Sequence, residues 1–287
     1  MAGSQLINLG ELSRPATVLV EKISDAVGGA FRPYQIVRVA KAEAEAEQIR
    51  AESRIKVTEI EKRAMLRFLE EEGKRQANIE SITQKALPLL DPESSPDKMS
   101  DDWITNFFDK SRIVSDSEMQ QLWSRVLAGE ANLPGSFSRR TVNLIADLEK
   151  RNAESFESLC RFGWRHKVLS TFLFPLVVDV RNEIYRKGGL SFGLLSNLES
   201  LGLLKFDIYN GFTLGNEPRL VELSYFGSTV QLTLPDQSPG SLSLGEVIFT
   251  DAGQELAQIC TPQRVEGFVE YMLERWEGKN LKPRVLQ

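Results

Sequence analysis

The chain has 287 residues, of which 41% are hydrophobic and 26% are charged, and its formal net charge at pH 7 is −5. This length is sufficient for two domains, and the acidic balance excludes a general electrostatic attraction to nucleic acid or anionic lipid. The two cysteines, Cys160 and Cys260, are too few for a disulfide framework, which favours a reducing compartment.

The N-terminus has no basic region followed by an apolar core, so it does not resemble a signal peptide. The most apolar run, residues 168–180, is shorter than the ~20 residues that a membrane-spanning helix requires. We therefore expect a cytoplasmic protein, with any membrane contact limited to the periphery of the inner membrane.

Residues 1–35 predict an amphipathic helix over 14–31, with Ser13 as its N-cap. The apolar face of this helix has two interpretations. It packs against the arm or a sister subunit, which we favour, or it lies in a lipid interface. The candidate partner or membrane contacts are Leu19, Ile23, Val27, Phe31 and Tyr34.

Residues 36–90 predict a long helical arm, because they are rich in Ala, Glu, Lys, Arg and Gln and contain no proline before Pro88. An unbroken helix from Ala40 to Leu87 would be roughly 70 Å long at 1.5 Å per residue. Apolar residues follow steps of three or four until the charged run 70–75 interrupts them, so no heptad repeat is sustained; these residues are Ile49, Val57, Ile60, Ala64 and Phe68. A short coiled coil or a local helical hairpin is consistent with this pattern, and an arm of this kind favours self-association.

The turn-rich segment 91–97 is the best candidate for a domain boundary. A small helical domain is predicted over 97–162. Its helices include one that carries Trp103, Phe107 and Phe108, and one that contains Trp123 and opens with a capping box from Ser115 to Glu118. We expect the aromatic residues to form a core, and we expect Asn152 to cap the last helix.

Residues 163–287 change character and predict an α+β module. A helix capped by Ser191 precedes a strand at 203–206, and Asn210-Gly211 is typical of a hairpin turn. A second hairpin is predicted around Gly227-Ser228. Thr250 then caps a helix and Pro262 opens the last one. The overall fold class is therefore mainly α with a C-terminal α+β part, comprising a long N-terminal arm, a small helical domain and a winged-helix-like module.

The sequence offers little catalytic machinery. His166 is the single histidine, and we expect it to be interfacial or partly exposed. No phosphate-binding loop and no zinc-type spacing of Cys and His occur. Asp101, Asp102 and Asp109 could ligate a cation, but Asp102 is better explained as a helix cap. We expect no cofactor and no metal, and we favour a non-enzyme, although paired carboxylates alone can serve an enzyme.

A winged helix also raises DNA as a partner, but charge argues against it. Residues 165–260 contain seven Lys or Arg and ten Asp or Glu, and the candidate recognition helix at 191–200 contains no cation. Because phosphate contacts from Lys and Arg supply most non-specific affinity for DNA, the module is better suited to docking a protein.

Three runs carry a family resemblance: DDWITNFFDK at 101–110, VSDSEMQQLWSRVLAGE at 114–130 and PGSFSRRT at 134–141. With the Ala/Glu-rich arm before them and the mixed module after them, they resemble a bacterial family of unknown function over nearly the whole chain. More distantly, Glu118, Leu122, Trp123, Leu127 and Ala128 resemble the alpha-type abortive-infection proteins of phage defence. Neither resemblance implies a catalytic residue.

These observations favour a non-enzymatic bacterial interaction protein that self-associates through its arm, docks a protein at its C-terminal module and acts in antiviral defence. One alternative is a winged-helix DNA-binding regulator. Another is a metal-dependent nuclease that uses its acidic residues.

Overall fold

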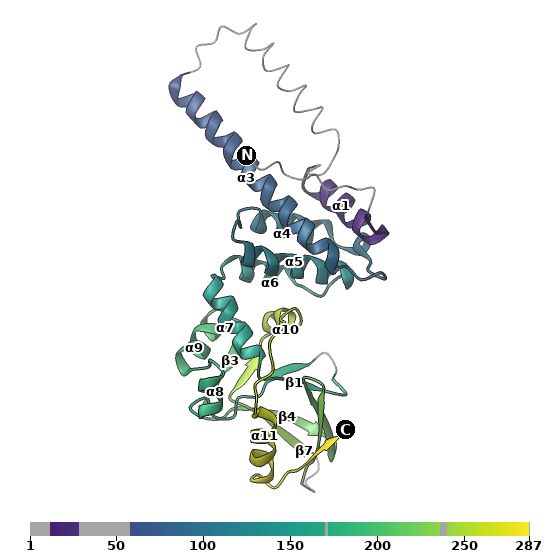
Figure 1. Cartoon of the computed structure of the whole chain (residues 1–287), viewed down its shortest axis with the longest axis vertical. Helices are drawn as coiled ribbons and strands as arrows, with labels where there is room; N and C mark the ends of the chain where they lie inside the picture. Colours follow the sequence, from purple (N-terminus) through teal and green to yellow (C-terminus); the bar gives the residue numbers. More distant parts are fainter. Residues whose placement is uncertain (1–11, 29–57, 170–171, 236–239, 287) are drawn as a thin grey trace. The chain divides into compact units, whose positions relative to one another are not determined.

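The computed structural model describes residues 12–28, 58–169, 172–235 and 240–286 (Figure 1). The chain divides into two compact units, residues 1–146 and 147–287. The described residues form an α+β mixture, with helices in the first unit and antiparallel strands added in the second.

The first unit is helical. Its elements are α1 (Arg14–Ala26), α3 (Glu59–Ala86), the short 3-10 helices η2 (Leu87–Leu89) and η3 (Pro96–Lys98), α4 (Asp101–Ser111), α5 (Ser117–Asn132) and α6 (Arg139–Ala146). Its core confirms the predicted aromatic cluster. Trp103 stacks on Phe107 with ring centroids 5.0 Å apart, and Phe107 meets Trp123 edge-on at 5.1 Å. The Trp103 indole N–H donates to the carbonyl of Phe137 at 2.6 Å, so its polar atom is satisfied inside the core.

The start of α3 differs from the unbroken helix predicted from Ala40. Thr58 has extended backbone (φ −64°, ψ 156°) and forms a capping box with Glu61. The Thr58 N–H donates to Glu61 Oε2 at 2.7 Å, and the Glu61 N–H donates to Thr58 Oγ1 at 3.3 Å. A residue in this conformation ends helical geometry on its N-terminal side. The helix is therefore 28 residues long, and residues 36–57 of the predicted arm lie outside the described residues.

Other helix boundaries also differ from the predictions. Asp116, not Ser115, caps α5, because its carboxylate is better placed to accept from the N–H groups of Glu118 and Met119, at 3.0 and 2.9 Å. Ser13, as predicted, caps α1. The turn-rich segment at 91–97 lies within the first unit, and the division between the units falls after Ala146.

The second unit comprises helices and three antiparallel sheets. Its helices are α7 (Lys150–Cys160), α8 (Glu183–Lys187), α9 (Phe192–Ser200), α10 (Asp251–Ala257) and α11 (Phe268–Glu277). Its strands are β1 (Gly163–His166), β2 (Leu173–Pro175), β3 (Leu204–Phe206), β4 (Phe212–Glu217), β5 (Leu220–Tyr225), β6 (Ser228–Thr233), β7 (Gly240–Gly245), β8 (Val247–Phe249) and β9 (Lys282–Leu286). The strand orders are β2-β1-β5-β6-β9, β3-β8 and β4-β7.

Aromatic side chains from sheet and helix fill the core of this unit. Trp164 of β1 stacks on Tyr225 of β5 at 5.0 Å and meets Trp276 of α11 at 5.3 Å. Phe268 and Met272 of α11 are buried with them, as predicted. The last helix thus closes one face of the five-stranded sheet.

The two predicted hairpins have different outcomes. β5 and β6 are joined by Phe226 and Gly227, both with positive φ (44° and 85°), which is the geometry of a tight hairpin turn. The hairpin predicted at Asn210-Gly211 is wrong, because β3 pairs with β8 and β4 pairs with β7. The Asp207 carboxylate accepts from the N–H groups of Tyr209 and Asn210, and this turn passes the chain from one ladder to the next.

Two further helices begin at residues other than those predicted from the sequence. The helix predicted to begin at Asn152 begins at Lys150, after Glu149, and α7 belongs to the second unit. The helix predicted to open at Pro262 begins at Phe268, after Gly267 with φ 73°. The caps at Ser191 and Thr250 are confirmed, since their hydroxyls accept from the N–H groups of Leu194 and Gly253.

Candidate interaction surfaces

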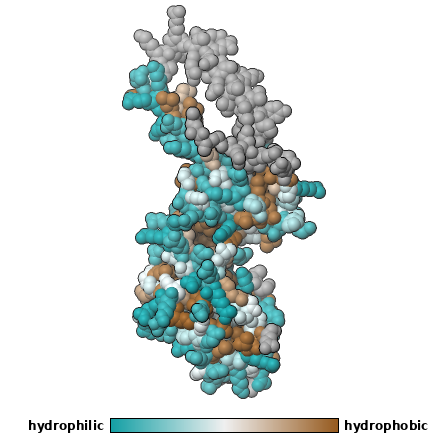
Figure 2. All heavy atoms as spheres, viewed as in Figure 1, coloured by the Kyte–Doolittle hydropathy of each residue, from teal (hydrophilic) through white to brown (hydrophobic). Residues whose placement is uncertain are grey.

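The N-terminal half of α3 extends away from the rest of its unit and exposes apolar side chains (Figures 1 and 2). Every residue from Glu59 to Glu71 is exposed, and Phe68 keeps 60% of its surface accessible. On a helical projection, most of the apolar side chains fall on one face, which we call the apolar strip. It consists of Ile60, Ala64, Met65, Phe68 and Leu69. Leu66 is equally exposed but lies on the opposite side of the helix.

The C-terminal half of α3 buries the same face. Ile79, Ile82 and Ala86 are buried, and α3 packs there chiefly on α5. Polar contacts fix this packing: Ser124 Oγ donates to the carbonyl of Ile82 at 3.1 Å, and Gln120 Nε2 donates to Asn78 Oδ1 at 3.2 Å.

The strip continues this buried face along the helix. Ile60, Ala64, Phe68, Glu72, Arg75, Ile79, Ile82 and Ala86 follow one another at steps of three or four residues. Glu72 and Arg75 form an ion pair that separates the exposed part from the buried part. One continuous helix face thus changes from a packed surface to an uncovered one.

Charges on the exposed half of α3 balance. Residues 59–75 contain five carboxylates and five cations. The cations Lys62, Arg63 and Arg67 precede the acidic run 70–72. Hydrogen bonds from the backbone and hydroxyl of Thr58 lower the pKa of Glu61, so this carboxylate stays charged at the first turn of the helix.

The residues predicted to contact a partner or a membrane begin on α1, where most of the apolar face is covered by the first unit. Leu19 and Ile23 are fully buried, because α1 packs on α4 and η3. Lys22 anchors the helix through its ammonium group, which donates to the carbonyl of Met99 at 3.0 Å and to Asp101 Oδ1 at 2.6 Å. Val27 is half-buried, whereas Phe31 and Tyr34 lie outside the described residues. In this arrangement the side chains of Leu19 and Ile23 are enclosed by their own unit.

A second exposed apolar patch lies in the second unit, where α9 meets β3. We call it the aromatic patch: the exposed Phe192 lies against the half-buried Phe206, and the exposed Ile208 and Tyr209 follow Phe206 closely in the chain. The rings of Phe192 and Phe206 are 5.2 Å apart, and Tyr209 is 90% exposed. Exposed aromatic side chains that cluster in this way are typical of protein-binding surfaces.

His166 is buried rather than interfacial or partly exposed, with 2% of its surface accessible. Its Nδ1 accepts the N–H of Leu169 at 3.2 Å, which leaves Nε2 as the protonated nitrogen, and Nε2 lies 3.0 Å from Glu217 Oε2. The imidazole thus contacts through Nε2 a carboxylate whose side chain is only 7% exposed. Neither nitrogen is free to serve a nucleophile.

The acidic residues considered as metal ligands have structural contacts. Asp101 pairs with Lys22, Asp109 pairs with Lys110 and Arg112, and Asp102 lies in the first turn of α4 after the N-cap residue Ser100. Among the residues that the structure describes, no group of three or more His, Cys, Asp or Glu side chains could hold a metal ion.

Sequence reasoning identified part of the apolar strip. The spacing of Ile60, Ala64 and Phe68 was visible, but Met65 and Leu69 were not assigned to it. The signal that could have found them is the continuation of the buried stripe from Ile79 back through Glu72. Sequence reasoning missed the aromatic patch, because Phe192 and Phe206, whose rings lie together in it, belong to separate elements.

Comparison with known proteins gives one match. A family model described as "Protein of unknown function (DUF2806)" matches residues 62–273. No curated protein and no solved structure matches the chain. Within the described residues, none of the helices combines the length and apolar character needed to cross a membrane.

Proposed function

Since the chain belongs to the DUF2806 family, whose description names no activity, we propose from its own surfaces that it is a non-enzymatic assembly protein. It self-associates when the apolar strip of α3 pairs with the strip of a second copy. The observation that carries this proposal is the exposure of Ile60, Met65, Phe68 and Leu69 on a helix face that is buried further along.

Energetics supports an occupant for the strip. Burying a side chain such as Phe, Leu, Ile or Met contributes about 1.5–3 kcal/mol. Covering the apolar strip with a partner would therefore add several such contributions to the free energy of association. A helix of this length buries on the order of 1,000 Å² when it pairs, which is near the lower limit for a specific interface. The proposed association is therefore of modest affinity and depends on concentration.

Charge supports a second copy as the occupant. Because the carboxylates and cations of 59–75 are equal in number, two copies do not repel each other through net charge. An antiparallel arrangement brings the cations at 62–67 toward the acidic run at 70–72, whereas a parallel one brings like charges together. The strip is not flanked by a basic face, as a helix that binds anionic lipid would be.

The test compares two matched substitutions on α3. Phe68→Gln removes an aromatic anchor from the strip, and Leu66→Gln makes the same kind of change on the opposite side. Gln favours helix in both positions. Analytical ultracentrifugation over a range of protein concentrations measures the dissociation constant. We expect Phe68→Gln to weaken self-association at least tenfold and Leu66→Gln to leave it nearly unchanged.

Equal effects of the two substitutions, or a wild-type chain that stays monomeric at high concentration, would refute a second copy as the occupant. Flotation with vesicles of neutral and anionic lipid separates the lipid alternative. Binding to vesicles that is lost in Phe68→Gln would replace self-association with membrane contact.

The second unit supports a separate protein-docking role. Helices α8 and α9 and the β3–β8 ladder occur in the order of a winged helix, with strands β4 to β7 inserted where a wing would be. The aromatic patch beside α9 offers the docking surface. Tyr209→Ser with Phe192→Ser should abolish capture of a specific partner from the cells of origin, while Phe68→Gln retains it. Loss of capture in Phe68→Gln alone would assign docking to the strip instead.

The proposed biological setting is cytoplasmic antiviral defence. Its support is the resemblance to alpha-type abortive-infection proteins at Glu118, Leu122, Trp123, Leu127 and Ala128 on α5. Trp123, Leu127 and Ala128 are buried, so the resemblance bears on the fold of α5 more than on a role. Plaque formation on cells that express the wild-type chain, Phe68→Gln or Leu66→Gln tests this setting. Protection that is lost in Phe68→Gln alone would connect defence to assembly, and equal plaque numbers with and without the chain would end this proposal.

A further inference from the structure

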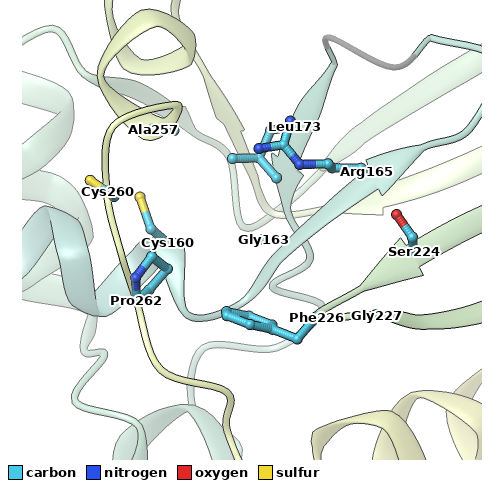
Figure 3. A pocket seen from close by; sticks show the side chains of 10 residues that line it. All are labelled: Cys160, Gly163, Arg165, Leu173, Ser224, Phe226, Gly227, Ala257, Cys260 and Pro262. Carbon is cyan, nitrogen blue, oxygen red and sulfur yellow. The ribbon is translucent and has the colours of Figure 1, made fainter. Parts of the chain in front are cut away.

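The two cysteines of the chain, a hundred residues apart in sequence, line one pocket in the second unit (Figure 3). Both are free thiols, and Cys260 lies close enough to Cys160 to contribute to the raised pKa of the Cys160 thiol. Cys160 is the last residue of α7 and Cys260 follows α10, so two separate elements bring the sulfur atoms together. The pocket has a volume of about 280 Å³, at the small end of the range for ligand pockets, roughly 300–1,000 Å³.

Neighbouring contacts hold the two thiols in place. Arg161, next to Cys160, donates from Nε to the carbonyl of Gln263 at 3.3 Å. The N–H of Val265 donates to the hydroxyl of Tyr225 at 2.9 Å, and Tyr225 in turn donates to the carbonyl of Arg161 at 2.9 Å. The segment after Cys260 is thereby tied to the end of α7, which keeps both cysteines at the same pocket.

The two thiols differ in access. Cys160 is buried, and burial together with the neighbouring Cys260 thiol raises its pKa, so this residue is protonated and unreactive on its own at neutral pH. Cys260 is only half-buried and can meet a reagent that enters the pocket. This asymmetry fits a residue that reacts first and a second residue that resolves the product.

We propose that Cys160 and Cys260 are a redox-modification site that forms a reversible intramolecular disulfide by exchange with an anionic, low-molecular-weight disulfide. In the first step the Cys260 thiolate attacks one sulfur of the reagent, forms a mixed disulfide and releases one half as a thiol. In the second step Cys160 gives up its proton and its sulfur attacks the sulfur of Cys260. The internal disulfide forms, the bond between Cys260 and the other half breaks, and this half takes up the proton and leaves as a second thiol. Two protein thiols are oxidised and one reagent disulfide is reduced to two thiols.

Arg165 gives the preference for an anion. Among the described residues that line the pocket it is the charged one, and its guanidinium makes no ion pair with any residue that the structure describes. Figure 3 shows its side chain across the pocket from the two sulfur atoms. A carboxylate on the reagent can pair with this guanidinium while the disulfide reaches Cys260. Oxidised glutathione has this chemistry.

The experiment incubates the full chain with oxidised glutathione at neutral pH, quenches with acid and maps thiols and disulfides by mass spectrometry without reduction. We expect the wild-type chain to lose both thiols, gain a Cys160–Cys260 bond within one chain and retain no glutathione. Cys160→Ala should accumulate one glutathione on Cys260, whereas Cys260→Ala should leave Cys160 unreacted. A glutathione retained on the wild-type chain, no loss of thiols, or a bond between chains would overturn the proposal.

Arg165→Gln tests the anionic preference without altering either thiol. We expect it to slow the reaction with oxidised glutathione severalfold, to leave a neutral disulfide such as hydroxyethyl disulfide unaffected and to accelerate the cationic cystamine. Equal rates for the three reagents in wild type and variant would remove the preference. The thiol count of the wild-type chain before and after oxidation needs no variant, so the disulfide stays testable if Cys160→Ala does not fold.

Discussion

The helices α1 and α3 both carry an apolar face, but only α1 has that face covered along its whole described length. Leu19 and Ile23 are inaccessible beneath α4 and η3, whereas Phe68 on α3 is 60% exposed. The comparison teaches that an amphipathic pattern predicts that a face will be covered, but not by what. A face covered by its own chain stabilises the fold, and a face left open is available for assembly.

The largest expected effect is a loss of stability when a residue on the covered face of α1 is replaced. Ile23→Ala should lower the free energy of unfolding by about 2–4 kcal/mol, because a buried side chain is removed and a cavity remains. Urea denaturation followed by circular dichroism measures it. Ile60→Ala on the open face is the matched control, and we expect less than about 0.5 kcal/mol there. Similar losses at both positions would mean that Ile60 is covered within its own chain.

The open face should respond through association instead. Ala64→Glu places a charge in the centre of the strip without removing a packed side chain, and should weaken self-association by about 1.4 kcal/mol or more, which is tenfold or more in the dissociation constant. Sedimentation velocity measures it, with Ala77→Glu on another side of α3 as the control. An unchanged constant in Ala64→Glu would place the interface elsewhere.

The N-caps of α5 and α3 test the same difference between a packed helix and an open one. Asp116→Ala removes the cap of the packed helix α5 and should lower global stability by about 1 kcal/mol. Thr58→Ala removes the cap of the open end of α3, so its effect should remain local. Hydrogen exchange should accelerate over the first turn of α3 while the urea midpoint stays nearly constant. A global loss in Thr58→Ala as large as that in Asp116→Ala would contradict the independence of the open end.

The smallest expected effect is a pH dependence of hydrogen-exchange protection in the first turn of α3. The pKa of Glu61 is lowered in the folded chain by its hydrogen bonds with Thr58. A lowered carboxylate pKa adds stability that is complete above the unfolded pKa and is lost as pH falls through the folded one. Protection of the first turn of α3, corrected for intrinsic exchange, should therefore fall as pH drops through the acidic range. Glu61→Gln should abolish this dependence, and its persistence in that variant would assign it to another group.

Local chemistry made much of the fold predictable. The caps at Ser13, Ser191 and Thr250 and the aromatic core around Trp103 depend on nearby residues and are confirmed. Errors arose where two local signals compete. Asp116 stands beside Ser115 and takes the cap of α5, and Asn210-Gly211 has hairpin chemistry although β3 finds its partner in β8. Strand partners that are distant in sequence leave no local trace.

The candidate sites divide in the same way. Helical periodicity identified Ile60, Ala64 and Phe68 as one face, and also identified the face of Leu19 and Ile23. Whether each face is exposed depends on the position of other helices, which periodicity does not contain. Cys160 and Cys260 were seen as two separate thiols, and their meeting in one pocket depends on the packing of α7 against the segment after α10.

By itself the sequence determined the helical character of the first unit and the change to an α+β second unit, because these follow from composition, spacing and local capping. Tertiary structure decided that α1 is covered and half of α3 is open, that His166 is buried against Glu217, and that the two cysteines line one pocket. Each of these depends on contacts between distant residues, and the free energy of such contacts is a property of packing rather than of local pattern.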